Sequence, residues 1–284
     1  MTTNHAVPKP SSVTQASPQP FLSSLKMKPL NAPITSWAGK RIWLVGASSG
    51  IGAALAQGLL QAGAFVVVSA RRGDHLANVA APYANASVLP FDVTDTEAWP
   101  LALATVLERL GQIDLVVMGA ARYDPTHSWQ IDIEQAQKSF DLNVVSVYRG
   151  LSVIVPQLLE QGHGGISLIG SISGYTGLPR ALIYGATKAA LQNLCETLYF
   201  ELAPKGLGVY LINPGFVQTP MTSANDFEMP GLMTPEAAAS AIMRGFERGH
   251  FEIRFPKAFS FLLRVISMLP DRLRFFLLHK TTKM

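Results

Sequence analysis

Tyr184 and Lys188 form a pair whose residue types and spacing fit acid–base chemistry. They lie four residues apart in Tyr-Gly-Ala-Thr-Lys, so on a helix their side chains are neighbours on one face. A tyrosine loses its proton at about pH 10, and an adjacent ammonium favours the phenolate. The pair could therefore exchange a proton near neutral pH. The same spacing also occurs on many helices without a catalytic role, so the pair needs supporting residues.

Two polar residues elsewhere in the chain supply that support. Ser171 follows the apolar segment 165–170, and its hydroxyl could hydrogen-bond a substrate carbonyl or alcohol. Asn143 is a polar residue within an otherwise largely apolar helical pattern. It could belong to the same site, or it could merely cap or kink that helix.

A glycine-rich segment, Arg-Ile-Trp-Leu-Val-Gly-Ala-Ser-Ser-Gly-Ile-Gly at residues 41–52, is the candidate cofactor site. An apolar strand pattern ends at Gly46, and a helical pattern begins near Gly52. Glycines allow the backbone to approach a pyrophosphate, and the N–H groups and dipole of the helix start favour its charge. The candidate contacts are Gly46, Ser48, Ser49, Gly50, Ile51 and Gly52. The spacing differs from Gly-x-Gly-x-x-Gly, so a purely structural turn is the alternative.

The elements that must position these residues alternate along the chain. Apolar strand patterns occupy 42–45, 64–69, 86–91, 113–118, 165–170 and 208–212, and helical patterns occupy 51–62, 97–110, 131–159 and 183–203. Such alternation predicts an α/β fold with a doubly wound parallel sheet of the Rossmann type. Ligands of this fold bind beyond the carboxyl ends of the strands.

Length and composition are consistent with one large domain. The chain has 284 residues, of which 48% are hydrophobic. We assign residues 37–254 to a dinucleotide-binding and catalytic domain, preceded by a flexible leader at 1–36 that has six prolines and no signal-peptide pattern. The one cysteine, Cys195, and the scattered histidines indicate a reducing compartment and no metal site. We therefore expect a cytoplasmic protein.

The C-terminal segment, residues 255–284, is predicted to be a basic amphipathic helical extension. Residues 244–284 hold nine Lys or Arg but three Asp or Glu. In 257–269, the pattern places Lys257, Ser260, Arg264 and Ser267 on one helical face, and Phe259, Leu262, Leu263, Ile266 and Leu269 on the other. Pro270 then ends the helix. The segment could pack on the domain, lie on an anionic membrane or mediate self-association.

With these motifs taken together, the chain resembles the classical short-chain dehydrogenase/reductase family over residues 40–250. The resemblance rests on the glycine turn, Asn143, Ser171, the Tyr184–Lys188 pair, and Asn-Pro-Gly at 213–215. It implies that Tyr184 transfers the proton, Lys188 lowers the pKa of Tyr184 and bonds the nicotinamide ribose, Ser171 orients the reacting oxygen, and Asn143 holds a water linked to Lys188. It further implies cofactor contacts from Asp92, Val93, Pro214, Gly215, Val217 and Thr219.

The chain departs from the family pattern at two places. Val45 stands where the family has Thr, and Met118-Gly119-Ala120-Ala121 replaces Asn-Asn-Ala-Gly. Both changes remove side-chain groups that brace the cofactor turn. Because backbone groups make much of the cofactor contact, we still expect binding.

The cofactor preference follows from the end of the second strand pattern. Ala70 stands where an acidic residue would select NAD(H), and Arg71 and Arg72 follow it. Guanidinium groups match a 2′-phosphate in charge and geometry, so we predict NADP(H). The alternative is that both arginines are solvated loop charges.

The expected function is an NADP(H)-dependent oxidoreductase that interconverts a ketone and a secondary alcohol. Met221, Phe227, Met229, Leu232 and Met233 in segment 219–234 favour a hydrophobic or lipid-like substrate, unless they only pack on each other. The resemblance implies a homo-oligomer formed through the helices that contain Asn143 and Tyr184. The alternatives are a non-catalytic dinucleotide sensor and a membrane-associated binding protein on the same fold, peripheral on the inner membrane face through residues 256–284. We expect no nucleic-acid partner.

Overall fold

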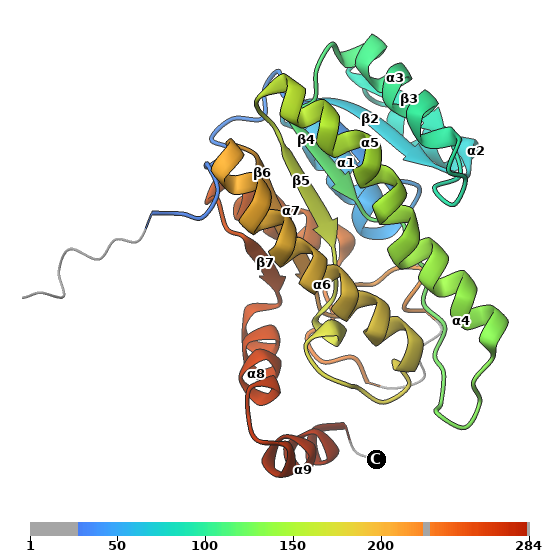
Figure 1. Cartoon of the computed structure of the whole chain (residues 1–284), viewed down its shortest axis with the longest axis vertical. Coiled ribbons are helices and arrows are strands. Elements are labelled where there is room, and N and C mark those ends of the chain that lie inside the picture. The colour runs from blue at the N-terminus through green and yellow to red at the C-terminus, as the bar shows by residue number, and fades with distance from the viewer. Residues whose placement is uncertain (1–27, 224–227, 283–284) are drawn as a thin grey trace, which may run out of the picture.

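The computed structural model describes residues 28–223 and 228–282 (Figure 1). Its centre is a parallel sheet in the order β3-β2-β1-β4-β5-β6-β7. The strands are β1 (Arg41–Val45), β2 (Phe65–Ala70), β3 (Ala86–Pro90), β4 (Leu115–Met118), β5 (Gly165–Ile169), β6 (Gly208–Pro214) and β7 (Glu252–Phe255). The order reverses between β1 and β4, so the predicted doubly wound Rossmann-type fold is confirmed.

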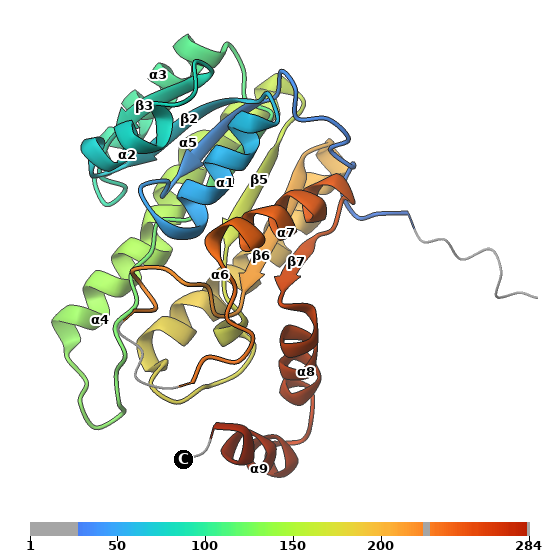
Figure 2. The ribbon, with the colours of Figure 1, turned by 180° about the vertical axis from the view of Figure 1, so that it is seen from behind.

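Helices cover both faces of the sheet (Figures 1 and 2). One face carries α1 (Gly50–Gln61), α2 (Gly73–Ala80) and α7 (Pro235–Glu247), and the other carries α3 (Ala98–Leu110), α5 (Ser146–Gln161) and α6 (Leu182–Leu202). Successive residues of β1 supply both cores: Ile42 and Leu44 pack with α1 and α7, whereas Trp43 and Val45 pack with α3, α5 and α6. This two-sided burial explains why the strands are continuous apolar runs.

The predicted helix at 131–159 is divided in the structure. It consists of α4 (Ile133–Phe140), a π-helical turn at Asp141–Val145, and α5. Within the described residues this is the helical stretch that is long and apolar enough to cross a membrane. Val147, Leu151, Ile154 and Leu158 of α5 are nevertheless buried against the sheet, which is the position of a core helix.

Several parts of the chain differ from the sequence prediction. Helices α2 and α7 were not among the predicted helical patterns; α2 has eight residues and gives a short pattern between β2 and β3. The leader is predicted to be flexible through residue 36, yet Asn31 is buried and its side chain bonds both the N–H and the carbonyl of Val209. The segment around Asn31 therefore belongs to the domain. Residues 1–27 lie outside the described part of the chain.

The C-terminal extension consists of α8 (Lys257–Ser267) and α9 (Asp271–Thr282). Both follow β7 and lie beyond the carboxyl ends of the strands (Figure 2). Their helical character matches the prediction, but the assignment of faces in α8 is wrong at two positions. Ser260 is fully buried, and its hydroxyl is satisfied there by the carbonyls of Pro256 and Lys257, whereas Leu262 is exposed.

Candidate active site

The turn between β1 and α1 packs so tightly against neighbouring backbone that side chains do not fit at Gly46 and Gly52. A Cβ on Gly52 would lie 2.2 Å from the carbonyl oxygen of Gly46, and one on Gly46 would lie 2.5 Å from the amide nitrogen of Ala120. Gly46 also has a φ of 92°, in the region that favours glycine. The start of α1 is thereby left open toward the carboxyl ends of β1 and β4.

Backbone groups brace this turn in place of the missing side chains. The N–H of Gly46 bonds the carbonyl of Ser69 at 2.7 Å, and the N–H of Gly119 bonds the carbonyl of Val45 at 2.8 Å. A Cβ on Gly119 would collide with the Ile169 side chain at 2.7 Å. The departures at Val45 and at 118–121 therefore leave the turn attached to β2 and β4.

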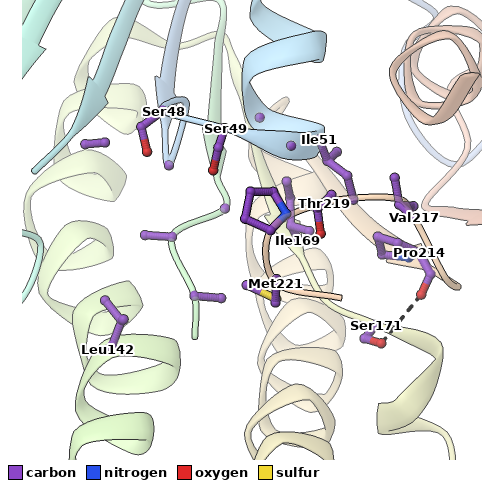
Figure 3. Close-up of a pocket in the computed structure, with 18 of the residues that line it drawn as sticks. Ser48, Ser49, Ile51, Leu142, Ile169, Ser171, Pro214, Val217, Thr219 and Met221 are labelled. Atoms are coloured by element: carbon purple, nitrogen blue, oxygen red, sulfur yellow. Dashed lines mark hydrogen bonds between the residues drawn. The ribbon is translucent and has the colours of Figure 1, made fainter. Parts of the chain in front are cut away.

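A crevice extends from this turn along the carboxyl ends of the strands (Figure 3). Its lining contains most of the residues predicted to hold the cofactor, which are Gly46, Ser48, Ser49, Gly50, Ile51, Gly52, Arg71, Arg72, Val93, Pro214, Gly215, Val217 and Thr219. Ser171, Tyr184 and Lys188 line the same crevice. Leu142, Ile169 and Met221 also line it.

Positive charge gathers at the end of the crevice beside β2. Arg72 donates to the hydroxyl of Ser48 at 3.3 Å, which places its guanidinium against the glycine turn. Arg71 lies 3.8 Å from Asp92; the side chain of Arg71 is 69% exposed and that of Asp92 is 39% exposed. Asp92 thus sits at the crevice rim as a partner of Arg71, beside Val93 in the lining.

At the other end, α6 presents Tyr184 to the crevice. The hydroxyl of Ser171, which follows β5, lies beside the phenol of Tyr184 and acts to lower its pKa. The ammonium nitrogen of Lys188 lies 5.5 Å from the centre of the Tyr184 ring and donates to the carbonyl of Ile169 at 2.7 Å. The structure therefore brings together the serine, tyrosine and lysine that were selected from the sequence.

Burial dominates the proton affinities of this pair. It raises the pKa of Tyr184 to about 12, although Ser171 acts in the opposite direction. It also lowers the pKa of Lys188 to about 7, since only 2% of this residue is exposed. The expected lowering of the Tyr184 pKa is therefore wrong for the protein alone, because desolvation by burial has the largest effect and raises it.

Asn143 lies in the π-helical turn and is fully buried behind the site. Its amide oxygen accepts from the N–H of Arg122 at 2.8 Å, and its amide nitrogen donates to the carbonyl of Arg122 and to Thr187. The hydroxyl of Thr187 in turn donates to the carbonyl of Tyr184 at 2.7 Å. Asn143 thus ties the loop after β4 to α6, and its side chain is not part of the crevice lining.

A second, apolar pocket adjoins the crevice and shares Ser171 and Tyr184 with it. Its walls include Tyr123, Leu178, Phe216, Met221 and Phe259. The Tyr123 ring lies 5.0 Å from that of Tyr184, and the Phe216 and Phe259 rings are stacked at 6.0 Å. The two hydroxyls that could bind a reacting oxygen therefore stand where a polar crevice meets an apolar cavity.

Sequence reasoning missed most of the apolar pocket. Of the lid residues named from the sequence, Met221 lines it, while Phe227 lies outside the described residues. Phe216 directly follows the Pro214-Gly215 motif, and that adjacency could have identified it. Tyr123 and Phe259 carry no local signal, because each reaches the site through the tertiary fold. Within the described residues, no group of His, Cys, Asp or Glu side chains could hold a metal ion.

Comparison with known proteins decides the family. The family model described as short chain dehydrogenase matches residues 40–229. The chain belongs to the short-chain dehydrogenase family. This short-chain dehydrogenase is 32% identical over 234 residues to an uncharacterized oxidoreductase of Myxococcus xanthus (strain DK1622), covering 81% of this chain and 92% of the relative. It is 34% identical over 201 residues to an uncharacterized oxidoreductase of Staphylococcus epidermidis, covering 70% of this chain and 87% of the relative.

Solved structures show the same fold. A short-chain dehydrogenase from Streptomyces avermitilis is 28% identical with a TM-score of 0.74, over 87% of this chain and 98% of that one. A 3-ketoacyl-(acyl-carrier-protein) reductase from Brucella melitensis, solved with NADH, is 23% identical with a TM-score of 0.72, over 78% and 100% of the two chains. The predicted family and the oxidoreductase class of this short-chain dehydrogenase are confirmed.

Proposed function

We propose that this short-chain dehydrogenase interconverts a ketone and a secondary alcohol, with NADP(H) as cofactor and an apolar molecule as substrate. The observation that carries the proposal is the position of Tyr184 and Ser171. Both residues line the glycine-lined crevice and also the apolar pocket, so their hydroxyls lie at the junction of the two. A substrate carbonyl placed there would meet two hydrogen-bond donors while its apolar part stays in the pocket.

The crevice residues fit a dinucleotide. The glycines hold the backbone open where any Cβ would fill the space, and the start of α1 lies there without an acidic residue in its first turn. Such a helix start binds phosphate. Solved relatives of the same fold from Brucella melitensis and Burkholderia phymatum contain NADH and NAD, respectively. When bound, the nicotinamide would supply or take up the hydride.

Tyr184 is suited to give a proton to the substrate oxygen. Because its pKa is raised to about 12, the phenol is protonated at neutral pH. In carbonyl reduction its O–H proton passes to the oxygen that becomes the alcohol, while Ser171 holds the other lone pair of that oxygen. In alcohol oxidation the same proton returns. The ammonium of Lys188, 5.5 Å from the Tyr184 ring, stabilises the phenolate left after transfer.

The preference for NADP(H) rests on Arg71 and Arg72. Both line the crevice at the end of β2. Ala70 occupies the position at which an acidic side chain would favour NAD(H). A 2′-phosphate would gain charge-assisted hydrogen bonds there. The partial neutralisation of Arg71 by Asp92 leaves Arg72, bonded to the neutral Ser48, as the stronger phosphate ligand.

The decisive experiment follows NADPH oxidation with a series of medium-chain and long-chain ketones. We expect substrate-dependent oxidation that falls about a thousandfold in Tyr184→Phe, since a positioned general acid contributes 10²–10⁴-fold. Tyr148→Phe, at an exposed tyrosine on α5, is the matched control and should retain activity.

Cofactor dissociation constants from the same preparations test the cofactor assignment separately. NADPH should bind more tightly than NADH, and the difference should shrink in Arg72→Ala. NADH binding equal to or tighter than NADPH binding would contradict the NADP(H) assignment. Tight dinucleotide binding without turnover of any ketone or alcohol would favour the alternative, a non-catalytic dinucleotide sensor.

A further inference from the structure

The inward faces of α8 and α9 attach the extension to the active-site region. Leu263, Ile266 and Leu278 are buried together with Ile172, which lies in the turn after Ser171. The guanidinium of Arg264 lies 5.0 Å from the centre of the Tyr175 ring in the same turn. The extension is thus a packed part of the molecule with a defined outer face.

That outer face is unusually apolar for a surface. Six large hydrophobic side chains of α8, α9 and the residues between them are between 46% and 70% exposed: Phe261, Leu262, Met268, Leu273, Phe275 and Phe276. On α8, Phe261 lies opposite the buried Leu263 and Ile266, and the exposed Leu262 lies at the edge between the two faces. On α9, Leu273 and Phe276 lie opposite the buried Leu278. Both helices therefore bury one apolar face and expose another.

Cations border these exposed side chains. Lys257, Arg272 and Lys280 are exposed, and within the described part of the chain none of the three forms an ion pair. Residues 256–282 contain one acidic side chain, Asp271, which pairs with Arg274. A helix with aromatic and leucine side chains on its outer face and Lys or Arg beside them is typical of binding at a lipid interface, where the long cationic side chains reach the headgroups.

We propose that the outer face of α8 and α9 docks on an anionic lipid surface. The exposed Phe and Leu side chains enter the boundary between headgroups and acyl chains, and Lys257, Arg272 and Lys280 contact anionic headgroups. Charge complementarity selects this occupant over a second copy of the same face. Two such faces brought together would oppose their unpaired cations across the contact.

The position of the substrate pocket gives this docking a functional meaning. Phe259 lines the apolar pocket from the inward side of α8, while Phe261 is exposed on the outward side of the same helix. A helix with its side chains is about 10 Å thick, so the pocket lies about one helix diameter from the docked surface. An apolar substrate could then enter from the lipid. This consequence rests on the proposed function, whereas lipid docking does not.

The test is sedimentation of the full chain with phosphatidylcholine vesicles, with and without phosphatidylglycerol. We expect binding to the anionic vesicles that weakens as sodium chloride is raised. Leu273→Ser combined with Phe276→Ser should reduce the partition coefficient by about tenfold or more, because it removes apolar side chains from the interface. Arg272→Gln combined with Lys280→Gln should reduce it by about thirtyfold, because each cation near an anionic surface contributes about 1 kcal/mol.

Matched controls separate this surface from general effects of exposed residues. Leu101→Ser removes an exposed leucine from α3, and Lys205→Gln removes an exposed cation after α6; both should sediment like the wild type. Dinucleotide binding and the thermal unfolding midpoint show that each variant is folded. Phe275 is left unchanged because the Arg274 guanidinium packs on its ring.

Three results would overturn the proposal. One is equal sedimentation of the wild type with neutral and anionic vesicles. Another is a Leu273→Ser/Phe276→Ser protein that partitions like Leu101→Ser. The third is an oligomer in vesicle-free solution that dissociates in the same double variant, because the face would then cover a second copy. None of these measurements uses turnover, so failure of the proposed oxidoreductase function would leave them interpretable.

Discussion

Lys188 is an ionisable residue that the fold buries almost completely. Its ammonium is held by one strong hydrogen bond, to the carbonyl of Ile169, beneath the ring of Tyr184. Burial lowers the pKa of Lys188 to about 7, from an ordinary value of about 10.5. The amine therefore changes its protonation near neutral pH, which would suit the proton transfer proposed for Tyr184.

This residue should leave a signature in the pH dependence of stability. Between the folded pKa near 7 and the unfolded pKa near 10.5, the unfolded chain binds more protons at Lys188 than the folded chain, so stability rises with pH in that window. Below the folded pKa both states carry the proton, and the penalty for burying the charge is complete. Replacing Lys188 by Met, an apolar side chain of similar length, should remove this dependence.

The measurement is urea unfolding of the wild type and Lys188→Met between pH 6 and pH 9. From pH 7 to pH 9 the free energy of unfolding of the wild type should rise relative to Lys188→Met by about 2 kcal/mol, since one pKa unit corresponds to about 1.4 kcal/mol. Lys205→Met, at an exposed lysine, should instead follow the wild type. Parallel pH profiles for the wild type and Lys188→Met would show that the Lys188 pKa is not lowered.

At the scale of elements, α8 contacts both the apolar pocket and the turn after β5. Its Phe259 stacks on Phe216 to close the apolar pocket, and its Arg264 packs on Tyr175. The Tyr175 hydroxyl in turn bonds the Glu252 carboxylate of β7. The carboxylate also accepts from the Asn213 amide of β6 at 2.7 Å. The C-terminal extension is therefore bound to the turn that carries Ser171, and it supplies part of the pocket wall beside the hydroxyls of Ser171 and Tyr184.

If α8 forms the substrate wall, truncation of Phe259 should affect long substrates selectively. Phe259→Ala should raise KM for a long-chain ketone about tenfold. Loss of the aromatic contact with the substrate removes roughly 1–2 kcal/mol of binding free energy. The kcat and the KM for a short ketone should change little, since Ser171 and Tyr184 remain in place.

Phe261→Ala is the matched control for this prediction, because the same residue type stands on the outward side of the same helix. Steady-state kinetics of both variants with a short and a long ketone make the comparison. Equal KM changes for the two ketones, or equal effects of the two substitutions, would remove α8 from the substrate site.

At the scale of the whole molecule, the surface of α4, α5 and α6 remains available for a second copy. Tyr148 on α5 and Phe200 on α6 are exposed to 53% and 77%, and both helices cover the same face of the sheet (Figure 1). Large exposed aromatic side chains are typical of protein interfaces. These are the helical regions through which the sequence resemblance implies self-association.

We predict a homo-oligomer that depends on this surface. Tyr148→Glu combined with Phe200→Glu should shift the mass measured by light scattering after gel filtration toward that of one chain, because buried carboxylates without partners oppose association. Leu101→Glu, at an exposed leucine of α3, is the control and should leave the mass unchanged. A wild-type protein that elutes as a monomer at all concentrations tested would contradict the prediction.

The amino-acid sequence determined the features that depend on short spacings. Continuous apolar runs identified the strands, because a sheet covered on both faces buries successive side chains on opposite sides, as Ile42 and Trp43 show. The glycine turn was readable since its conformation requires missing Cβ atoms. Tyr184 and Lys188 were readable as a pair because four residues make about one helical turn. Helices α2 and α7 were missed; the eight residues of α2 give too little periodicity, whereas the 13 residues of α7 could have been identified.

The tertiary structure decided what joins distant segments. Only the fold sets Phe259 against Phe216, Tyr123 against Tyr184, and Asn31 against Val209. It also reversed the expected proton affinity of Tyr184, because desolvation depends on every chain segment packed around a group, whereas the Lys188 neighbour was visible in the sequence. The same reason explains the buried Ser260 and the exposed Leu262: helical periodicity shows that a helix has faces, and packing decides which of them meets the domain.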